Sequence, residues 1–411
     1  MILADTVRST GLLVDIGWLA TCPAAGAQSD IGVIERAAMA WHNGRIEWVG
    51  READLPPELR DRETHSAEGR MVIPGLVDCH THLVFGGWRA DEFRRRVAGE
   101  SYLDIAASGG GIKRTMRQTR EADTNVLALH ALGCLREMAR LGVTTVECKT
   151  GYGLSLEDEL RLLRVVRDIR PRTPQRLVST LLAAHVVPPE CNKGSYIQMI
   201  TKELIPAVSA ENLATFNDIF VEEGAFSADD ARHILGVGKQ HGLQPKLHVD
   251  QLHDGHGAAL AAELGAISAD HLEFTSDAGR KAMAENGVTA VCLPLASLYL
   301  HQPPMDGRAF VEAGVLVAVA TDFNPGSAPS YDLPLAMMLA CTMSRLTPAE
   351  VLKGATIHAA RAIGVDKECG SLEPGKAADF AELSAGNVDH WMYHFRPNVC
   401  ERTWIAGQPI S

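Results

Sequence analysis

Two histidines separated by one residue stand at the end of an apolar run, in the stretch Val77-Asp78-Cys79-His80-Thr81-His82. Because side chains alternate between the two faces of a strand, His80 and His82 point the same way. Two imidazoles on one face form a ready pair of metal ligands. His-X-His also occurs by chance on ordinary strands, so the interpretation depends on the polar residues in the rest of the chain.

Further polar residues end later apolar runs in the same manner. They are His185, His248, His271 and Asp322. A lone histidine after a strand is more often structural than catalytic, but repetition of the pattern along the chain argues against coincidence. Three imidazoles and one carboxylate suit a single divalent ion, zinc or iron, with water in an open position.

This set of residues predicts a metal-dependent hydrolase. The ion would lower the pKa of its water from about 15.7 towards about 7. Asp322 would take the proton of that water and pass it to a leaving nitrogen. His271 would then orient the water or stabilise the developing oxyanion.

The composition is that of an ordinary globular protein. Its 411 residues are 46% hydrophobic and 22% charged, enough for a large core. The formal net charge of -12 argues against a nucleic-acid partner and favours a small-molecule substrate. Nine cysteines without a Cys-X-X-Cys pair predict reduced thiols in a cytoplasmic protein. Residues 1–5 show no secretory signal, and no apolar run reaches membrane-spanning length.

Continuous apolar runs alternate with amphipathic segments from about residue 72 to about residue 345. Continuous runs suit parallel strands that are buried on both faces. Eight strands alternating with helices predict an α/β fold, a (β/α)8 TIM-like barrel with its catalytic groups at the carboxyl ends of the strands. The alternative, an open doubly wound sheet, would need an early glycine-rich turn that is missing here. The runs are 72–79, 143–148, 177–184, 218–222, 245–249, 266–269, 288–293 and 315–320.

The two ends of the chain have a different pattern. Short strand-like runs near the N-terminus are broken by Gly44 and Gly50, and residues 370–380 are rich in turns. Neither piece is long enough for a core of its own. We therefore expect residues 1–68 and 361–411 to form one small composite β-sandwich domain, beside a barrel of residues 69–360.

Five stretches form a set of motifs, at 74–89, 108–112, 149–154, 184–185 and 321–327. Together they resemble the amidohydrolase superfamily and, within it, the imidazolonepropionase family. The resemblance runs nearly end to end. His-X-His and the late Asp are shared across the superfamily, whereas Gly-Gly-X-Arg, Lys-(Ser/Thr)-Gly-Tyr-Gly and Asp-X-Asn-Pro-Gly are typical of the family.

The resemblance implies hydrolysis of 4-imidazolone-5-propanoate to N-formimidoyl-L-glutamate in histidine degradation, by a cytoplasmic homodimer with one zinc or iron ion per chain. The implied metal ligands are His80, His82, His248 and Asp322. The implied catalytic group is Asp322, His271 and Gln251. The implied substrate contacts are Arg89, Tyr152, His185, Gln251, Asn324, Gly326 and Ser327. An arginine fork suits the propionate, and a tyrosine can cover a flat ring.

Two departures from the family pattern bear on this interpretation. Some members carry Glu where this chain has Gln251, which cannot act as a base, so proton transfer would rest on Asp322 and His271. Residues 293–299 also depart from the usual family stretch, which bears on the substrate. Lys149 stands at a strand end, where a carboxylated lysine would bridge two metals; we favour one metal.

Three functions remain open at this point. The leading one is hydrolysis of a cyclic amide. The second is deamination of a purine or pyrimidine by the same metal and water, for which a glutamate at position 251 would be typical. The third is a non-catalytic relative without metal, against which the intact ligand set speaks. Residues 108–111 are expected to form a mobile cover, because they lack the Lys-Ser/Thr of a phosphate loop.

Overall fold

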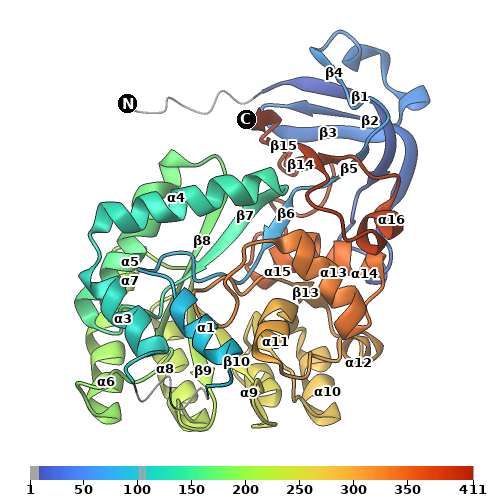
Figure 1. Cartoon of the computed structure of the whole chain (residues 1–411). Helices are drawn as coiled ribbons and strands as arrows, with labels where there is room; N and C mark the ends of the chain where they lie inside the picture. Colours follow the sequence, from blue (N-terminus) through green and yellow to red (C-terminus); the bar gives the residue numbers. More distant parts are fainter. Residues whose placement is uncertain (1–8, 101–103, 105–107, 411) are drawn as a thin grey trace.

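Two sheets organise the chain, as the computed structural model shows: a barrel of parallel strands and a mixed sheet beside it (Figure 1). The structure describes residues 9–100, 104 and 108–410. The N-terminal stretch in which we expected no secretory signal lies outside these residues. Among the described helices, none is both long and apolar enough to cross a membrane.

The barrel contains eight parallel strands in sequence order. They are β6 (Leu76–Asp78), β7 (Val143–Lys149), β8 (Arg176–Ala184), β9 (Phe216–Val221), β10 (Gln244–Val249), β11 (Ser268–His271), β12 (Thr289–Cys292) and β13 (Val317–Val319). The first and last strands meet just beyond their ends, through a parallel bridge between Thr81 and Phe323. A hydrogen bond from the Thr321 hydroxyl to Asp78 Oδ2 (2.6 Å) adds to this closure. The predicted (β/α)8 barrel is therefore confirmed.

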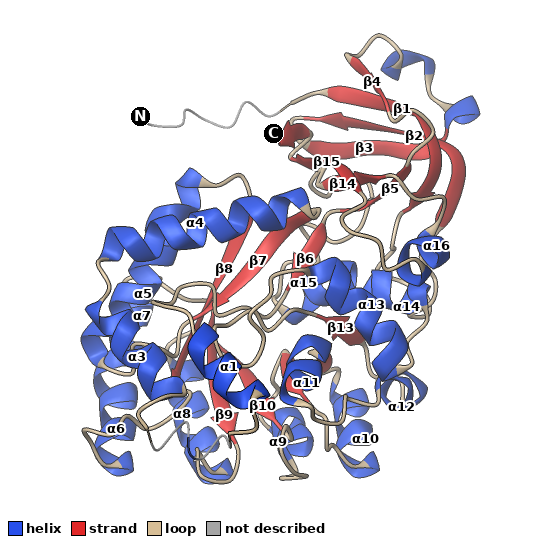
Figure 2. Cartoon of the chain, in the orientation of Figure 1, coloured by secondary structure: helices blue, strands red, loops and turns tan. Residues whose placement is uncertain are grey.

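Helices surround the barrel strands, as Figure 2 shows. Ser155 caps α5 by accepting a hydrogen bond from the Asp158 N–H. The first set comprises α1 (Ala90–Val97), α3 (Ile112–Glu121), α4 (Thr124–Arg140), α5 (Leu156–Ile169), α6 (Lys193–Met199), α7 (Ile205–Ala210), α8 (Ala228–Gln240) and α9 (Gly257–Glu263). The rest are α10 (Asp277–Asn286), α11 (Pro294–Leu300), α12 (Gly307–Glu312), α13 (Leu333–Ser344), α14 (Pro348–Lys353), α15 (Ala359–Ala362) and α16 (Val388–Tyr393). Two π-helical segments, η4 (Ile200–Leu204) and η5 (Gly354–His358), continue α6 and α14.

The mixed sheet combines strands from both ends of the chain. Its order is β16-β15-β14-β5-β1-β2-β3, with β4 paired to β1. The strands are β1 (Gly11–Ala20), β2 (Val33–His42), β3 (Arg45–Arg51), β4 (Thr64–Ser66), β5 (Met71–Pro74), β14 (Phe380–Leu383), β15 (Cys400–Ile405) and β16 (Gln408–Ile410).

This sheet curls back on itself around an aromatic core. In a flat sheet, β2 and β15 would lie four strand spacings apart, about 19 Å. The rings of Trp41 on β2 and Trp404 on β15 are nevertheless 5.7 Å apart, and Phe380 on β14 packs against both. The two halves of the sheet therefore face each other, in agreement with the composite β-sandwich expected from the two termini.

The first predicted run, 72–79, divides between the two sheets at Gly75. Met71–Pro74 pairs with β1 and β14, and Leu76–Asp78 pairs with β7. A Cβ atom at Gly75 would lie 2.3 Å from the Thr144 hydroxyl oxygen, so the crossing requires glycine. This pairing supports a junction between the two parts at Gly75, whereas the division at residues 68 and 360 stays a prediction.

Candidate active site

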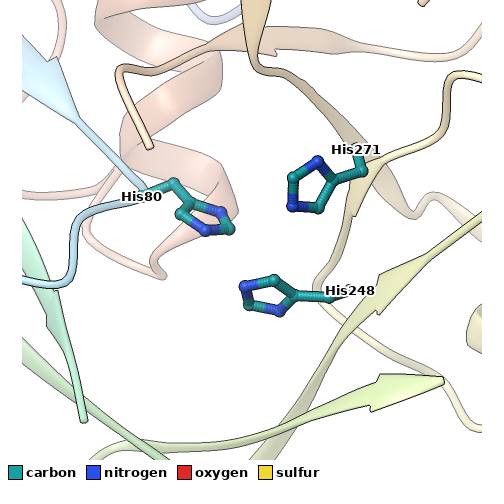
Figure 3. A group of neighbouring side chains, drawn as sticks. All are labelled: His80, His248 and His271. Atoms are coloured by element: carbon teal, nitrogen blue, oxygen red, sulfur yellow. The ribbon is translucent and has the colours of Figure 1, made fainter. Parts of the chain in front are cut away.

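The predicted metal ligands and the predicted catalytic residue His271 meet at the carboxyl ends of four barrel strands. His80 and His82 follow β6, His248 lies in β10, His271 ends β11, and Asp322 follows β13. The rings of His80, His248 and His271 point toward a common space (Figure 3). All five side chains are buried. The barrel thus brings together residues that are up to 242 positions apart, His80 and Asp322.

The donor atoms form two overlapping groups around His80. Those of His80, His248 and His271 lie within 4.8 Å of one another, and so do those of His80, His82 and Asp322. Asp322 Oδ1 is 3.4 Å from His80 Nε2 and 3.6 Å from His82 Nε2. The expected ligand set draws on both groups, and His271 is a fifth donor beside it.

Sharp backbone turns direct two of these side chains into the barrel mouth. His271 has a φ of 80° and Asp322 a φ of 55°, in the left-handed region that residues other than glycine seldom adopt. Such conformations cluster at functional sites, where the surrounding structure holds them in place.

Two buried carboxylates orient the histidines from behind. His80 Nδ1 is 2.7 Å from Asp270 Oδ2, and His248 Nδ1 is 3.1 Å from Asp218 Oδ1. The backbone oxygen of Thr150 lies 3.4 Å from His82 Nδ1. These contacts turn the Nε2 atoms toward the site, as in metal centres whose histidines are held by a carboxylate or carbonyl. Sequence reasoning assigned Asp218 and Asp270 no role, although an acidic residue inside an otherwise apolar buried strand was the available signal.

The donor set fits a divalent metal ion. His80 Nε2 and His248 Nε2 are buried and have no hydrogen-bond partner among the described residues. A buried nitrogen without a partner costs free energy unless a ligand satisfies it. Imidazole and carboxylate together suit zinc or iron.

Burial sets the protonation of the ligands. It lowers the pKa of His80 and of His82 well below the usual range, which favours the neutral form that binds metal. Burial raises the pKa of Asp322 to about 6, although His271 and His248 pull it down. A carboxyl with this pKa exchanges protons readily near neutral pH.

His271 has a partner that sequence reasoning missed. Its Nδ1 is 3.6 Å from Glu273 Oε1, and the Ser297 hydroxyl donates to the same oxygen at 3.2 Å. Burial alone would lower the pKa of His271, but Glu273, followed by Asp322 and Asp270, outweighs it and raises the pKa. The signal in the sequence was an acidic residue two positions after the histidine at a strand end, in His271-Leu272-Glu273.

Lys149 lies beneath the histidines between three carboxylates. Its Nζ is 2.7 Å from Asp218, 3.2 Å from Glu147 and 3.3 Å from Asp270. Burial alone would lower the pKa of Lys149. The charges of Asp218, Glu147 and Asp270 outweigh burial and hold the pKa of Lys149 well above its usual range. The side chain is therefore an ammonium ion whose hydrogen-bonding sites are directed at carboxylates.

Two aromatic groups border the site on the side of His82. The ring of His185 stacks on that of His82 at 5.3 Å, and Tyr152 lies 5.5 Å from His82 and 5.7 Å from His185. Burial lowers the pKa of His185 to about 4, so its ring is neutral at neutral pH. These predicted contact residues thus form one wall next to the donor atoms.

Arg89 reaches the loop that follows Asp322. Its Nε donates to the Pro325 backbone oxygen at 3.3 Å. Burial raises the pKa of Tyr152, and the positive charge of Arg89 opposes that rise. A Cβ atom on Gly326 would lie 1.3 Å from Arg89 Nη2, so glycine leaves the space that the guanidinium occupies. The structure thereby joins Arg89 and Gly326, which lie far apart in the sequence.

The remaining predicted substrate contacts differ in how many hydrogen bonds they already make within the protein. Asn324 is buried, and its amide is engaged in its own turn: Oδ1 accepts from the N–H groups of Gly326 and Ser327, and Nδ2 donates to the Asp322 backbone oxygen. Ser327 Oγ lies 3.4 Å from Asp322 Oδ2. Gln251 is half-buried just beyond β10. Contact of these residues with a substrate stays a prediction.

Comparisons with known proteins agree with this fold and site. A model of the amidohydrolase family matches residues 212–410. A protein of Shouchella clausii named imidazolonepropionase is 45% identical over 388 residues, 93% of this chain and 87% of the relative. One of Geobacillus kaustophilus with the same name is 43% identical over 98% of this chain and 97% of the relative. The chain therefore belongs to the imidazolonepropionase family of amidohydrolases.

The fold is also found among solved structures of lower identity. A zinc-bound adenosine deaminase from Xanthomonas campestris is 21% identical, with a TM-score of 0.72 over 97% of this chain and 92% of that one. At this identity the likeness supports the fold alone.

Proposed function

We propose that this protein is an imidazolonepropionase that hydrolyses the ring amide of 4-imidazolone-5-propanoate to N-formimidoyl-L-glutamate. The observation that carries the proposal is the pairing of a complete histidine–carboxylate donor set with Arg89, in a chain about 45% identical to relatives of that name. Hydrolysis adds one water across the bond between the ring carbonyl carbon and the ring nitrogen. The new carboxylate and the formimidoyl group remain on one product.

We assign the metal to His80, His82, His248 and Asp322. We assign His271 to catalysis instead, because Glu273 raises its pKa against the effect of burial, which suits a hydrogen-bond donor. A zinc or iron ion held there would supply a Lewis acid that makes water nucleophilic near neutral pH. One ion per chain is supported by Lys149, since carboxylation of a lysine needs a free amine and this one is an ammonium bound by three carboxylates.

The side chains then have separate tasks. Asp322 accepts a proton from the attacking water and returns it to the ring nitrogen as the carbon–nitrogen bond breaks. His271, held by Glu273, donates a hydrogen bond to the carbonyl oxygen as negative charge develops there. Gln251 cannot accept a proton and is assigned to hydrogen bonding with the substrate.

The side chains beside the metal ligands suit the substrate's two ends. Arg89 provides a guanidinium fork for the propionate carboxylate. Tyr152 and His185 provide flat rings and polar edges for the imidazolone. Asn324 shapes the 324–327 turn that carries Gly326 and Ser327 beside Arg89. We further propose a cytoplasmic homodimer: nine free cysteines support a reducing compartment, and the dimer rests on the family resemblance.

The test is ring opening by purified protein whose metal content has been measured. Freshly made imidazolonepropionate should lose its ultraviolet absorbance and yield formimidoylglutamate, and only with metal bound. Adenine, guanine and cytosine compounds should release no ammonia. Release of ammonia from one of them, without ring opening of imidazolonepropionate, would replace the proposal with a deaminase.

A further inference from the structure

A buried glutamate behind the active-site wall has no part in the proposed chemistry. Glu159 lies in the first turn of α5 and is fully enclosed. Its Oε1 accepts the N–H groups of Gly153 and Leu154, both at 2.8 Å, and each carboxylate oxygen lies 3.3 Å from the N–H of Gly151. The Thr150 hydroxyl is a further donor. One carboxylate therefore accepts hydrogen bonds from four donors of the 150–154 loop.

That loop carries the contacts which aim the wall of the site. The Thr150 backbone oxygen faces His82 Nδ1 at 3.4 Å, and the Gly151 backbone oxygen faces His185 Nδ1 at 3.1 Å. Tyr152, between them in sequence, lies against both rings. A shift of this loop would move a metal ligand and two substrate contacts together.

The loop adopts a conformation that needs support. Leu154 has a φ of 52° and Gly151 a φ of 107°, so two of its residues lie outside the ordinary backbone regions. A Cβ atom at Gly153 would lie 2.7 Å from the Asp158 backbone, which shows how closely the loop approaches α5. The Glu159 carboxylate supports this conformation by accepting several loop donors at once; burial raises the pKa of Glu159, and the hydrogen bonds from the loop oppose that rise.

We propose that Glu159 is a positioning residue, which holds the 150–154 loop so that His82, His185 and Tyr152 face the metal and the substrate. The inference deepens the proposed function and rests on it for the identity of the substrate. The expected role differs from simple support of the fold, because the loop's carbonyl oxygens act directly on the two histidines.

The test compares Glu159→Gln with Glu157→Gln. Both residues lie in the first turn of α5, but Glu157 is exposed. An amide offers the loop one acceptor and turns an N–H₂ group toward the remaining donors, so the loop should relax. We expect E159Q to raise KM for imidazolonepropionate at least about 10-fold and to alter the visible absorption spectrum of cobalt-substituted protein, through His82. E157Q should match the wild type in both.

Two outcomes would overturn the inference. One is an E159Q protein with a lower melting temperature but the wild-type KM and cobalt spectrum, which would make Glu159 a structural residue only. If E159Q does not fold, Glu159→Asp is the second variant. It keeps a carboxyl group but, being one methylene shorter, moves that group away from the 150–154 loop. A wild-type KM and spectrum in E159D would then refute the proposal. The cobalt spectrum needs no substrate, so it also separates failure of this inference from failure of the proposed function.

Discussion

Gly326→Ala tests the proposed propionate contact without changing Arg89, the arginine to which we assign it. Gly326 has no left-handed φ, so alanine fits the backbone there. The added Cβ would lie 1.3 Å from Nη2 and 2.4 Å from Cζ of Arg89. Because the guanidinium is the end of a flexible side chain, it must move while the loop stays.

The size of the effect is set by the contact that is lost. Truncating one partner of a buried charge pair costs about 2–4 kcal/mol, and we expect a similar loss when Arg89 is displaced. At about 1.36 kcal/mol per tenfold change, kcat/KM should fall roughly 30- to 900-fold. Metal content should remain unchanged, since neither residue is assigned as a ligand.

The assay is kcat/KM for imidazolonepropionate in four proteins: wild type, G326A, R89A and the double variant. If alanine acts by displacing Arg89, the double variant should be no worse than R89A. Gly133→Ala is the matched control, because a Cβ atom there would have no neighbour within 4 Å. Wild-type kcat/KM in G326A, or multiplied losses in the double variant, would refute the reasoning.

Three other predictions concern the metal, His271 and the buried His358. Removing the metal with a chelator should abolish ring opening and lower the melting temperature, and zinc or iron should restore both; activity that survives verified metal removal would contradict the assignment. His271→Asn should lower kcat about 10²- to 10³-fold with metal content intact, measured by kinetics and metal analysis, whereas loss of the metal would make His271 a ligand. Burial lowers the pKa of His358 to about 4, and in the unfolded chain the side chain takes a proton near pH 6.5, so the free energy of unfolding should fall as pH drops through this range. Denaturation at pH 7 and pH 5 should show that His358→Gln lessens the fall by about 2 kcal/mol; an equal fall in both proteins would show that His358 is not responsible.

The barrel was predictable because its strands are buried on both faces and therefore read as continuous apolar runs. The change of sheet at Gly75 was not, because apolar character is the same on both sides of the crossing. For the mixed sheet, the sequence predicted that the two ends of the chain join in one β-domain, but not how the sheet curls. Contacts such as that of Trp41 with Trp404 depend on pairing between distant segments.

The metal ligands were predictable from their place at strand ends, but the groups that orient them were harder to find. Asp218 and Asp270 could be located in strands, yet nothing in the sequence shows which histidine each one faces. Glu159 is one of several acidic residues at the start of an amphipathic helix, where acidic side chains are usually exposed. Only the approach of the 150–154 loop distinguishes it from Glu157.

The crossing at Gly75 also has a consequence for synthesis of the chain on the ribosome. β5 (Met71–Pro74) leads directly into β6 (Leu76–Asp78), which His80 and His82 follow, and the antiparallel neighbour of β5 is β14 (Phe380–Leu383). That neighbour is translated about three hundred residues later. The first histidines of the site are thus made early, just after a strand whose antiparallel neighbour is made almost last, so we expect β5 to take its final place only when translation is nearly complete.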